Sequence, residues 1–265
     1  MIESFQNQEV KRVVKLRRAR IRRKERLFVV EGCREIQVGL RSEISFQQAF
    51  FCRAFFANDS QEEALAEMRE RKIPLIEVAE GPFEKISMRA NPDGLLALAP
   101  TWETGIEDLS LGEHPLVLVV DGIEKPGNLG AVLRSAEAFG VDALLCVDPS
   151  LDLFNPNVIR ASQGLLFRVP VAVCERDRAV SFLRSRHLRI FSTSAKVEQS
   201  YWKMDFTEPA AIVLGSEAWG LDSFWLEASD EQITIPMFGE ADSLNLSVAV
   251  GCLLSEVKRQ RQFET

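Results

Sequence analysis

Apolar residues in the second half of the chain form short continuous runs that alternate with stretches of helical periodicity. The run PLVLVVD at 115–121 has the length of a strand and is apolar up to its last residue, as in a parallel strand buried on both faces. Residues 128–140 repeat apolar side chains at helical spacing and end on Gly140, which suits a helix C-cap. Further strands are predicted at 143–148, 168–173, 187–194, 210–215 and 232–237. This alternation predicts an α/β domain with a mostly parallel sheet.

The first hundred residues repeat the alternation on a smaller scale. Ser60 and Glu63 form the pattern of a capping box, which predicts a helix from Ser60 to about Arg71. Strands are predicted at 27–32, 49–57, 74–78 and 94–100, with a short helix at 33–42. These elements indicate a small α/β domain.

A polar segment and a long helix complete the organisation. Residues 101–114 contain two glycines and show neither helical nor strand periodicity. They are therefore predicted to link a domain at 1–100 to a domain at 115–265. The chain ends in an amphipathic helix over about 244–262. Its apolar stripe suits the chain's own core and a contact with a partner equally well, and consists of Leu246, Val250, Leu253, Leu254 and Val257.

Composition narrows the class of protein. Hydrophobic residues make up 46% and charged residues 27%, which is ordinary for a globular chain. No apolar run approaches the ~18–20 residues that cross a bilayer, and the N-terminus lacks the apolar core of a secretory signal. Five scattered cysteines are typical of a reducing compartment, and two histidines exclude a multi-histidine metal centre. We therefore expect a cytoplasmic protein without a membrane partner or a metal site.

Charge is distributed unevenly along the chain. The net charge is −7, yet residues 1–30 hold ten Lys and Arg against three Glu, hence +7, which leaves −14 for the remainder. Like charges gathered in this way repel one another, and a polyanionic partner such as RNA would stabilise them. A solvated N-terminal helix explains the same charges almost as well.

Three predicted strands are followed by segments rich in glycine and polar residues, at 121–134, 214–220 and 235–250. In parallel sheets, ligands bind beyond the carboxyl ends of the strands. Each segment also has a structural explanation, as a helix start, a loop with a solvated Glu217 and a cap at Ser243. The chain lacks a G-x-G-x-x-G dinucleotide fingerprint, a P-loop and a G-x-S-x-G nucleophile elbow.

Together, the three segments are more specific than each alone. NLGAVLR at 128–134, LGSEAWGL at 214–221 and the IPM and SLNLSVAV pieces of 235–250 resemble the three motifs of the SpoU/TrmH family. Members are RNA 2′-O-ribose methyltransferases that use S-adenosylmethionine. The basic leader that ends in LFVVEG also resembles the start of the family's small, ribosomal-protein-like substrate-binding domain.

The resemblance implies a trefoil-knotted (SPOUT) parallel-sheet domain, with loops 214–221 and 235–247 in the knot and 244–260 threaded through it. It also implies a homodimer whose interface includes the last helix. The family's catalytic positions match Asn128, Arg134, Glu217, Ser243 and Asn245. The positions that hold S-adenosylmethionine match Leu214, Gly215, Ile235, Met237 and Leu244. RNA contacts are expected from Arg17, Arg18, Arg20, Arg22, Arg23 and Lys24.

These expectations leave alternatives open. A separate N-terminal domain favours ribosomal RNA as substrate, with transfer RNA as the second choice. A guanidinium stays charged at neutral pH, so Arg134 is expected to anchor a phosphate and stabilise developing alkoxide charge rather than act as a base. A non-catalytic RNA-binding or ribosome assembly factor would also carry this fold. An oxidoreductase on a nucleotide-binding sheet is disfavoured by the missing glycine triplet.

Overall fold

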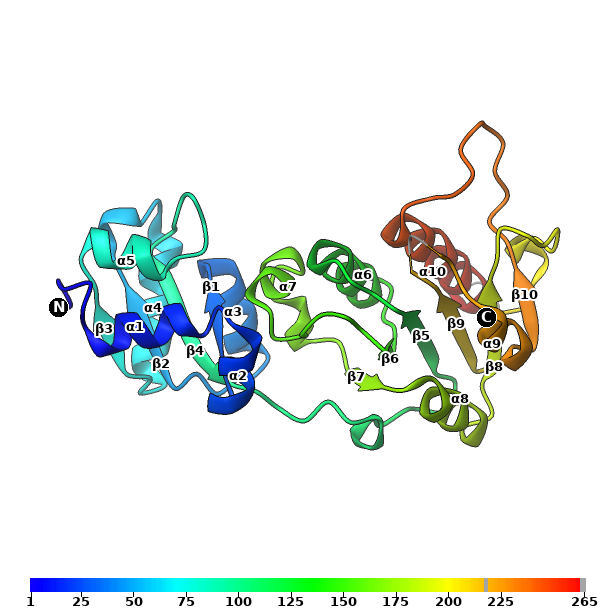
Figure 1. Cartoon of the computed structure of the whole chain (residues 1–265), viewed down its shortest axis with the longest axis horizontal. Helices are drawn as coiled ribbons and strands as arrows, with labels where there is room; N and C mark the ends of the chain where they lie inside the picture. Colours follow the sequence, from blue (N-terminus) through cyan, green and yellow to red (C-terminus); the bar gives the residue numbers. More distant parts are fainter. Residues whose placement is uncertain (217–218, 263–265) are drawn as a thin grey trace. The chain divides into compact units, whose positions relative to one another are not determined.

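The computed structural model describes residues 1–216 and 219–262, whose helices and strands are labelled in Figure 1. Contacts divide the chain into two compact units. Unit 1 comprises Met1–Trp102 and Asp152–Arg168, and unit 2 comprises Glu103–Leu151 and the chain from Val169 onward. Within the described residues, no helix is long and apolar enough to cross a membrane.

Unit 1 is built on a four-stranded sheet in the order β1-β4-β2-β3. β4 runs antiparallel to both of its neighbours, and β2 and β3 are parallel. The strands are β1 (Leu27–Glu31), β2 (Gln48–Phe51), β3 (Leu75–Glu77) and β4 (Leu95–Pro100). The α-helices are α1 (Gln8–Lys15), α2 (Ala19–Glu25), α3 (Cys33–Arg41), α4 (Asp59–Glu70), α5 (Glu80–Ile86) and α7 (Pro156–Ala161). Short 3-10 turns are η1 (Arg53–Phe55) and η3 (Leu165–Phe167).

Two local predictions for unit 1 are wrong. The predicted strand 49–57 ends at Phe51, because Phe51 pairs with Leu95, the first residue of β4, and the chain then turns into η1. The helix predicted to begin at Ser60 is capped by Asn58 instead. Its side chain accepts the Ser60 N–H at 3.0 Å, and Gln61 accepts the Asn58 N–H at 3.3 Å. Both N-x-x-Q and S-x-x-E satisfy the capping pattern, and the extended backbone at Asn58 selects the first.

The segment 152–168 belongs to unit 1, although the sequence suggests no break within 115–265. Phe154 packs its ring 5.1 Å from that of Phe28 and 4.6 Å from that of Trp102. Arg22 donates two hydrogen bonds to Asp152, at 2.8 and 2.6 Å. Aromatic packing and this ion pair therefore hold the segment to β1 and α2. The hydrophobic pattern of the segment itself predicts neither contact.

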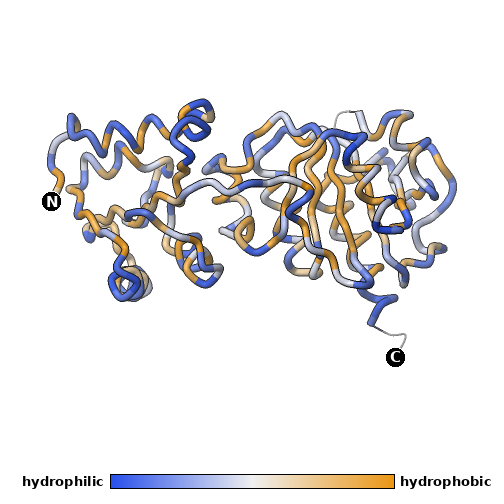
Figure 2. Tube along the Cα trace, turned by 90° about the horizontal axis from the view of Figure 1, so that it is seen from below, coloured by the Kyte–Doolittle hydropathy of each residue, from blue (hydrophilic) through white to orange (hydrophobic). Residues whose placement is uncertain are grey.

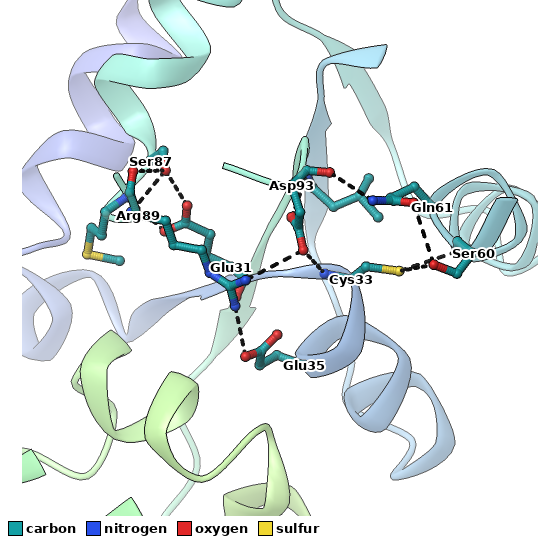
Figure 3. Close-up of polar contacts among 10 residues, drawn as sticks. Glu31, Cys33, Glu35, Ser60, Gln61, Ser87, Arg89 and Asp93 are labelled. Atoms are coloured by element: carbon teal, nitrogen blue, oxygen red, sulfur yellow. Dashed lines mark hydrogen bonds and ion pairs between the residues drawn. The ribbon is translucent and has the colours of Figure 1, made fainter. Parts of the chain in front are cut away.

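Glu31, the last residue of β1, lies in a buried polar network (Figure 3). The Glu31 carboxylate accepts hydrogen bonds from the Ser87 hydroxyl and, at 2.8 Å, from the Met88 N–H. Arg89 donates to the Glu31 carbonyl at 2.9 Å and to Glu35 at 2.8 Å. Gly32 has a φ of 117°, and an added Cβ would overlap the Arg89 side chain. Both last residues of LFVVEG thus have structural roles in unit 1: Glu31 accepts hydrogen bonds, and Gly32 supplies the positive φ.

Unit 2 contains a six-stranded, wholly parallel sheet in the order β10-β8-β9-β5-β6-β7, which confirms the predicted α/β class. Its strands form the apolar centre of the unit in Figure 2. They are β5 (Leu116–Asp121), β6 (Ala143–Val147), β7 (Val171–Cys174), β8 (Arg189–Thr193), β9 (Ala210–Leu214) and β10 (Glu231–Ile233). The helices are η2 (Ile106–Asp108), α6 (Pro126–Ala138), α8 (Arg176–Ser185), η4 (Tyr201–Lys203), α9 (Ser223–Ala228) and α10 (Leu246–Gln262).

Helices cover both faces of this sheet. Alternate β5 residues, Val117 and Val119, pack in one cluster with Ala179 and Leu183 of α8 and with Trp225 of α9. Figure 1 shows α6 beside α10, and the two helices pack on each other. All five residues of the predicted α10 stripe are buried within the single chain. The stripe therefore forms part of the chain's own core.

Two strand boundaries in unit 2 differ from prediction. β7 begins at Val171 instead of residue 168, because Pro170 has no N–H for the ladder, although its carbonyl accepts from Leu144 at 2.8 Å. β10 ends at Ile233 instead of residue 237. Beyond it, the Thr234 N–H donates to Gln199 outside the sheet, and the chain enters the loop that precedes α10.

Candidate active site

The carboxyl ends of β5 and β9 meet at the centre of the parallel sheet. From β5 the chain crosses to β6 on one side, and from β9 it crosses to β10 on the other side. Such a switch point leaves a crevice that commonly binds ligands. A cavity of about 210 Å³ lies there, lined by Gly122, Ile123, Glu124, Lys125, Asn128, Ser216 and Leu246.

The wall after β5 begins with a tight turn. Gly122 has a φ of 67° and donates its N–H to the Val147 carbonyl at 2.9 Å. Pro126 then occupies the first turn of α6, where its missing N–H costs nothing, so the helix begins two residues earlier than predicted. Asn128 faces the cavity from this first turn. Arg134 is exposed on α6, about 9 Å further along the helix axis at 1.5 Å per residue.

The wall after β9 is a compact loop. Leu214 is buried at the end of the strand, and Ser216 lines the cavity. Gly220 donates its N–H to the Ser216 carbonyl at 2.9 Å, and a Cβ on Gly215 would overlap the Gly220 backbone. The backbone of Gly220 therefore occupies the space that a side chain at position 215 would need. Glu217, the predicted acid of this segment, lies outside the described residues.

The third predicted segment contributes the start of α10. Asn245 caps this helix, because its side-chain oxygen accepts the Ser247 N–H at 3.0 Å and the Ser247 hydroxyl at 2.7 Å. Ser243, the cap suggested as its structural role, is exposed in the loop before it. Leu246 follows Asn245 and lines the cavity. The cavity thus brings together all three segments, whereas its lining does not include Ile235, Met237, Ser243 or Leu244.

A charged cluster that the sequence analysis missed lies at the same edge of the sheet. Arg176, the first residue of α8, donates to Asp121 at 2.9 and 3.3 Å and to Asp222 at 2.5 Å, and lies 3.6 Å from Asp148. Burial raises the pKa of Asp121, and the hydrogen bonds from Arg176 oppose that shift. The sequence offered one signal for this cluster: Asp121 and Asp148 are the last residues of predicted strands, and Arg176 follows the strand predicted at 168–173.

The basic leader divides into structural and exposed cations. Arg22 is 2% exposed and donates to the carbonyls of Leu16 and Arg17, at 2.8 Å each, and to Asp152. Arg17 donates to the carbonyls of Lys85 and Ser87 at 2.8 and 2.6 Å. Arg17 is nevertheless exposed, as are Lys15, Arg18, Arg20, Arg23, Lys24 and Arg26. Two of the six predicted RNA contacts therefore hold unit 1 together.

Comparison with known protein families identifies the family of the chain. The model described as the SpoU rRNA methylase family matches residues 115–255, more than half of the chain. The chain belongs to this family. A second model, described as the MRM3-like substrate binding domain, matches residues 7–97. The SpoU match spans the three segments that meet at the cavity, and the second match spans the basic leader and the Glu31 network.

Two curated relatives of this SpoU protein are ribosomal RNA methyltransferases by name. The 23S rRNA (guanosine(2553)-2′-O)-methyltransferase RlmP of Bacillus subtilis is 28% identical over 257 residues, 97% of this chain and 98% of the relative. The 23S rRNA (guanosine-2′-O-)-methyltransferase RlmB of Xylella fastidiosa Temecula1 is 40% identical over 164 residues, 60% of this chain and 66% of the relative.

Solved structures extend the similarity to the whole fold. A crystal structure of an RNA 2′-O ribose methyltransferase is 38% identical, with a TM-score of 0.88 over 99% of both chains. An AdoMet-bound rRNA methyltransferase from Sinorhizobium meliloti is 25% identical, with a TM-score of 0.87 over 97% of both chains. The fold class and the family resemblance are confirmed, and the trefoil knot stays a prediction.

Proposed function

We propose that this SpoU protein transfers a methyl group from S-adenosylmethionine to a ribose 2′-hydroxyl of ribosomal RNA. The observation that carries the proposal is the cavity where Asn128, Ser216 and Leu246 meet, one residue from each family-like segment. Both curated relatives named above act on 23S rRNA by name, and one of the two structural neighbours is AdoMet-bound. These names favour ribosomal RNA over transfer RNA and over a non-catalytic role.

The backbone at the end of β9, next to the cavity-lining Ser216, suits the methyl donor. Close packing of Gly215 on the Gly220 backbone places main-chain groups, instead of a side chain, at the end of β9. Main-chain groups without a covering side chain can approach a flat ligand closely. We assign the donor site to Leu214, Gly215, Ile235, Met237 and Leu244. S-adenosylmethionine supplies an electrophilic methyl group on a sulfonium, so the protein's task is positioning.

We assign roles to the polar residues, and the places of the described ones in the fold support the assignment. Asn128 orients the ribose from the first turn of α6. Arg134, which is exposed and permanently charged, fixes the neighbouring phosphate and stabilises negative charge on the 2′-oxygen. Asn245 sets the start of α10 beside the cavity. Glu217 and Ser243 complete the proposed set. Alignment of the two reactants by such contacts can supply several kcal/mol of the barrier reduction.

We assign the RNA surface of unit 1 to five of its exposed cations, Lys15, Arg18, Arg20, Arg23 and Lys24. Their charges are open to phosphates, whereas Arg17 and Arg22 are engaged with carbonyls and Asp152. Neutralising about five phosphates would make binding fall steeply with salt. Arg17 and Arg22 therefore act through the fold of α1 and α2.

The active form is proposed to be a cytoplasmic homodimer. Free, scattered thiols suit a reducing compartment. The outward face of α6 presents Gly127, Ala131 and Ala138 around Arg134, at spacings of three and four residues, and small side chains allow a partner helix to approach closely. Because the α10 stripe is used in the chain's own core, the partner would contact α6 and the opposite face of α10.

Label transfer tests the function directly. Tritiated S-adenosylmethionine is incubated with the protein and total RNA from a strain that lacks it, with Arg134→Ala as the control. Arg134 is a better control than Asn245, because its side chain is exposed and Asn245 caps α10. Alkali-resistant labelled dinucleotides of ribosomal RNA size from the wild type alone would support the proposal. Label in transfer RNA would instead identify transfer RNA as the substrate. A wild-type protein that binds no S-adenosylmethionine would refute the proposed methyltransferase activity.

A further inference from the structure

Arg176 connects the ends of separate strands at the carboxyl edge of the sheet. It begins α8, directly after β7, and its guanidinium reaches Asp121 at the end of β5 at 2.9 Å. The same group lies 2.5 Å from Asp222, after the β9 loop, and 3.6 Å from Asp148, after β6. One cation is therefore shared by three carboxylates that approach from different segments.

Two of these carboxylates adjoin the two walls of the cavity. Asp121 immediately precedes Gly122, the first lining residue of the β5 wall. Asp222 closes the loop whose other end carries Ser216, a lining residue of the β9 wall. The Gly215 position packs directly on the backbone of Gly220 and Leu221, so a displacement of Asp222 would be transmitted to Gly215. Arg176 thus ties the β9 loop to the end of β5.

The carboxylates of this cluster need the positive charge of Arg176. The Asp121 side chain is only 5% exposed, so it depends on a protein partner, whereas the Asp222 side chain is 50% exposed. Without the guanidinium, three carboxylates would share this edge of the sheet with no cation between them. The half-exposed Asp222 side chain could then turn toward solvent, which would release the backbone at Asp222 from the end of β5.

We propose that Arg176 is a positioning residue for methyl transfer: through Asp222 it holds the backbone of Gly220 and Leu221 against Gly215, in the arrangement that binds S-adenosylmethionine. The inference rests on the proposed function, because it concerns the same donor site. Arg176 touches neither reactant. Its effect is expected in donor affinity, while the chemical step at saturating donor stays intact.

Donor binding by calorimetry and steady-state kinetics test this in the full-length protein. Arg176→Met should raise both the Kd and the KM for S-adenosylmethionine about tenfold, in line with loss of a charge-assisted hydrogen bond. The kcat at saturating donor should stay within about twofold. Arg176→Lys should restore part of the affinity, because an ammonium keeps the charge without the guanidinium fork.

Two further variants separate positioning from stability. Asp222→Asn keeps the Arg176–Asp121 pair and should still weaken donor binding, which preserves the test if Arg176→Met fails to fold. Arg184→Met is the matched control on the same helix: it removes bonds of 2.7 and 2.8 Å to Asp230, before β10 and away from the cavity. This control should lower stability and leave the donor Kd unchanged.

The outcomes distinguish the two proposals. Wild-type affinity in folded Arg176→Met and Asp222→Asn, or equal weakening in Arg184→Met, would overturn the positioning role alone. A fall in kcat with unchanged donor affinity would also overturn it. A wild-type protein that fails to bind S-adenosylmethionine would refute the proposed function, and the role of Arg176 with it.

Discussion

Replacement of Arg22 by methionine separates cations that build unit 1 from cations that are open to RNA. The Arg22 side chain is 3% exposed and pairs with Asp152, whose side chain is 21% exposed. Removing one partner of a buried pair costs about 3–5 kcal/mol, and the carbonyls of Leu16 and Arg17 lose their donor as well. The neighbouring Arg23 is exposed, so Arg23→Met should cost less than about 0.5 kcal/mol.

Calorimetry and salt titration measure the two effects independently. In the full-length protein, Arg22→Met should lower the midpoint of the unit 1 transition by roughly 10 °C or more, and Arg23→Met should not. At a temperature where both variants are folded, Arg23→Met should reduce the slope of log Kd for RNA against log salt by about one. Arg22→Met should leave that slope unchanged. The assignment is refuted if Arg22→Met keeps the wild-type midpoint and reduces the slope as Arg23→Met does.

The remaining predictions concern unit 2. Gly215→Ala should abolish donor binding measured by calorimetry, because its Cβ would overlap backbone atoms that cannot rotate away. Burial raises the pKa of Cys146 to about 12 and that of Cys174 to about 11, so neither thiol should react with a thiol reagent at pH 8 before unfolding. Burial works against ionisation of Asp230, but bonds from Arg184 and a backbone amide outweigh it and lower its pKa. Its contribution to stability is therefore present above about pH 4 and lost as the pH falls further, so thermal midpoints of Asp230→Asn and wild type should converge there.

The first two of these predictions have internal controls. Gly112→Ala adds a methyl group where the described residues leave open space, so donor binding should survive. Cys252 is only partly buried and serves as the accessible thiol in the labelling experiment. Thermal midpoints of Asp230→Asn and wild type that stay equally far apart from pH 7 to pH 3 would contradict the assigned linkage.

The sequence predicted the centre of the parallel sheet well, because buried parallel strands are continuously apolar. Predicted strands 115–121, 143–148 and 210–215 match β5, β6 and β9 within one residue at each end. The predicted strand boundaries were wrong where a strand is limited by its neighbour in the sheet or by a missing backbone N–H. Pro170 delays β7, and the first residue of β4 limits β2. Neither cause is visible in the periodicity of the strand itself.

Residues of the candidate site could be proposed from the sequence where a motif includes them, whereas contacts between distant segments could not be predicted. Asn128 reaches the cavity as the family pattern implies. Arg22 looks like its basic neighbours until Asp152, 130 residues later, is brought against it. Arg176 is one arginine among many in the sequence, and only the order of the strands places it between Asp121 and Asp222.

Several family-like positions serve the fold and the proposed chemistry at once, which limits what their substitution can reveal. Asn245 caps α10 beside the cavity, and Gly215 leaves the space that the Gly220 backbone fills. Loss of activity on changing either residue would follow from a displaced helix or loop as readily as from a lost contact with substrate. Arg134 differs, because its side chain is exposed on a helix whose core contacts come from other positions. The chemical step is therefore best examined at Arg134, and the shape of the donor site at Arg176 and Asp222.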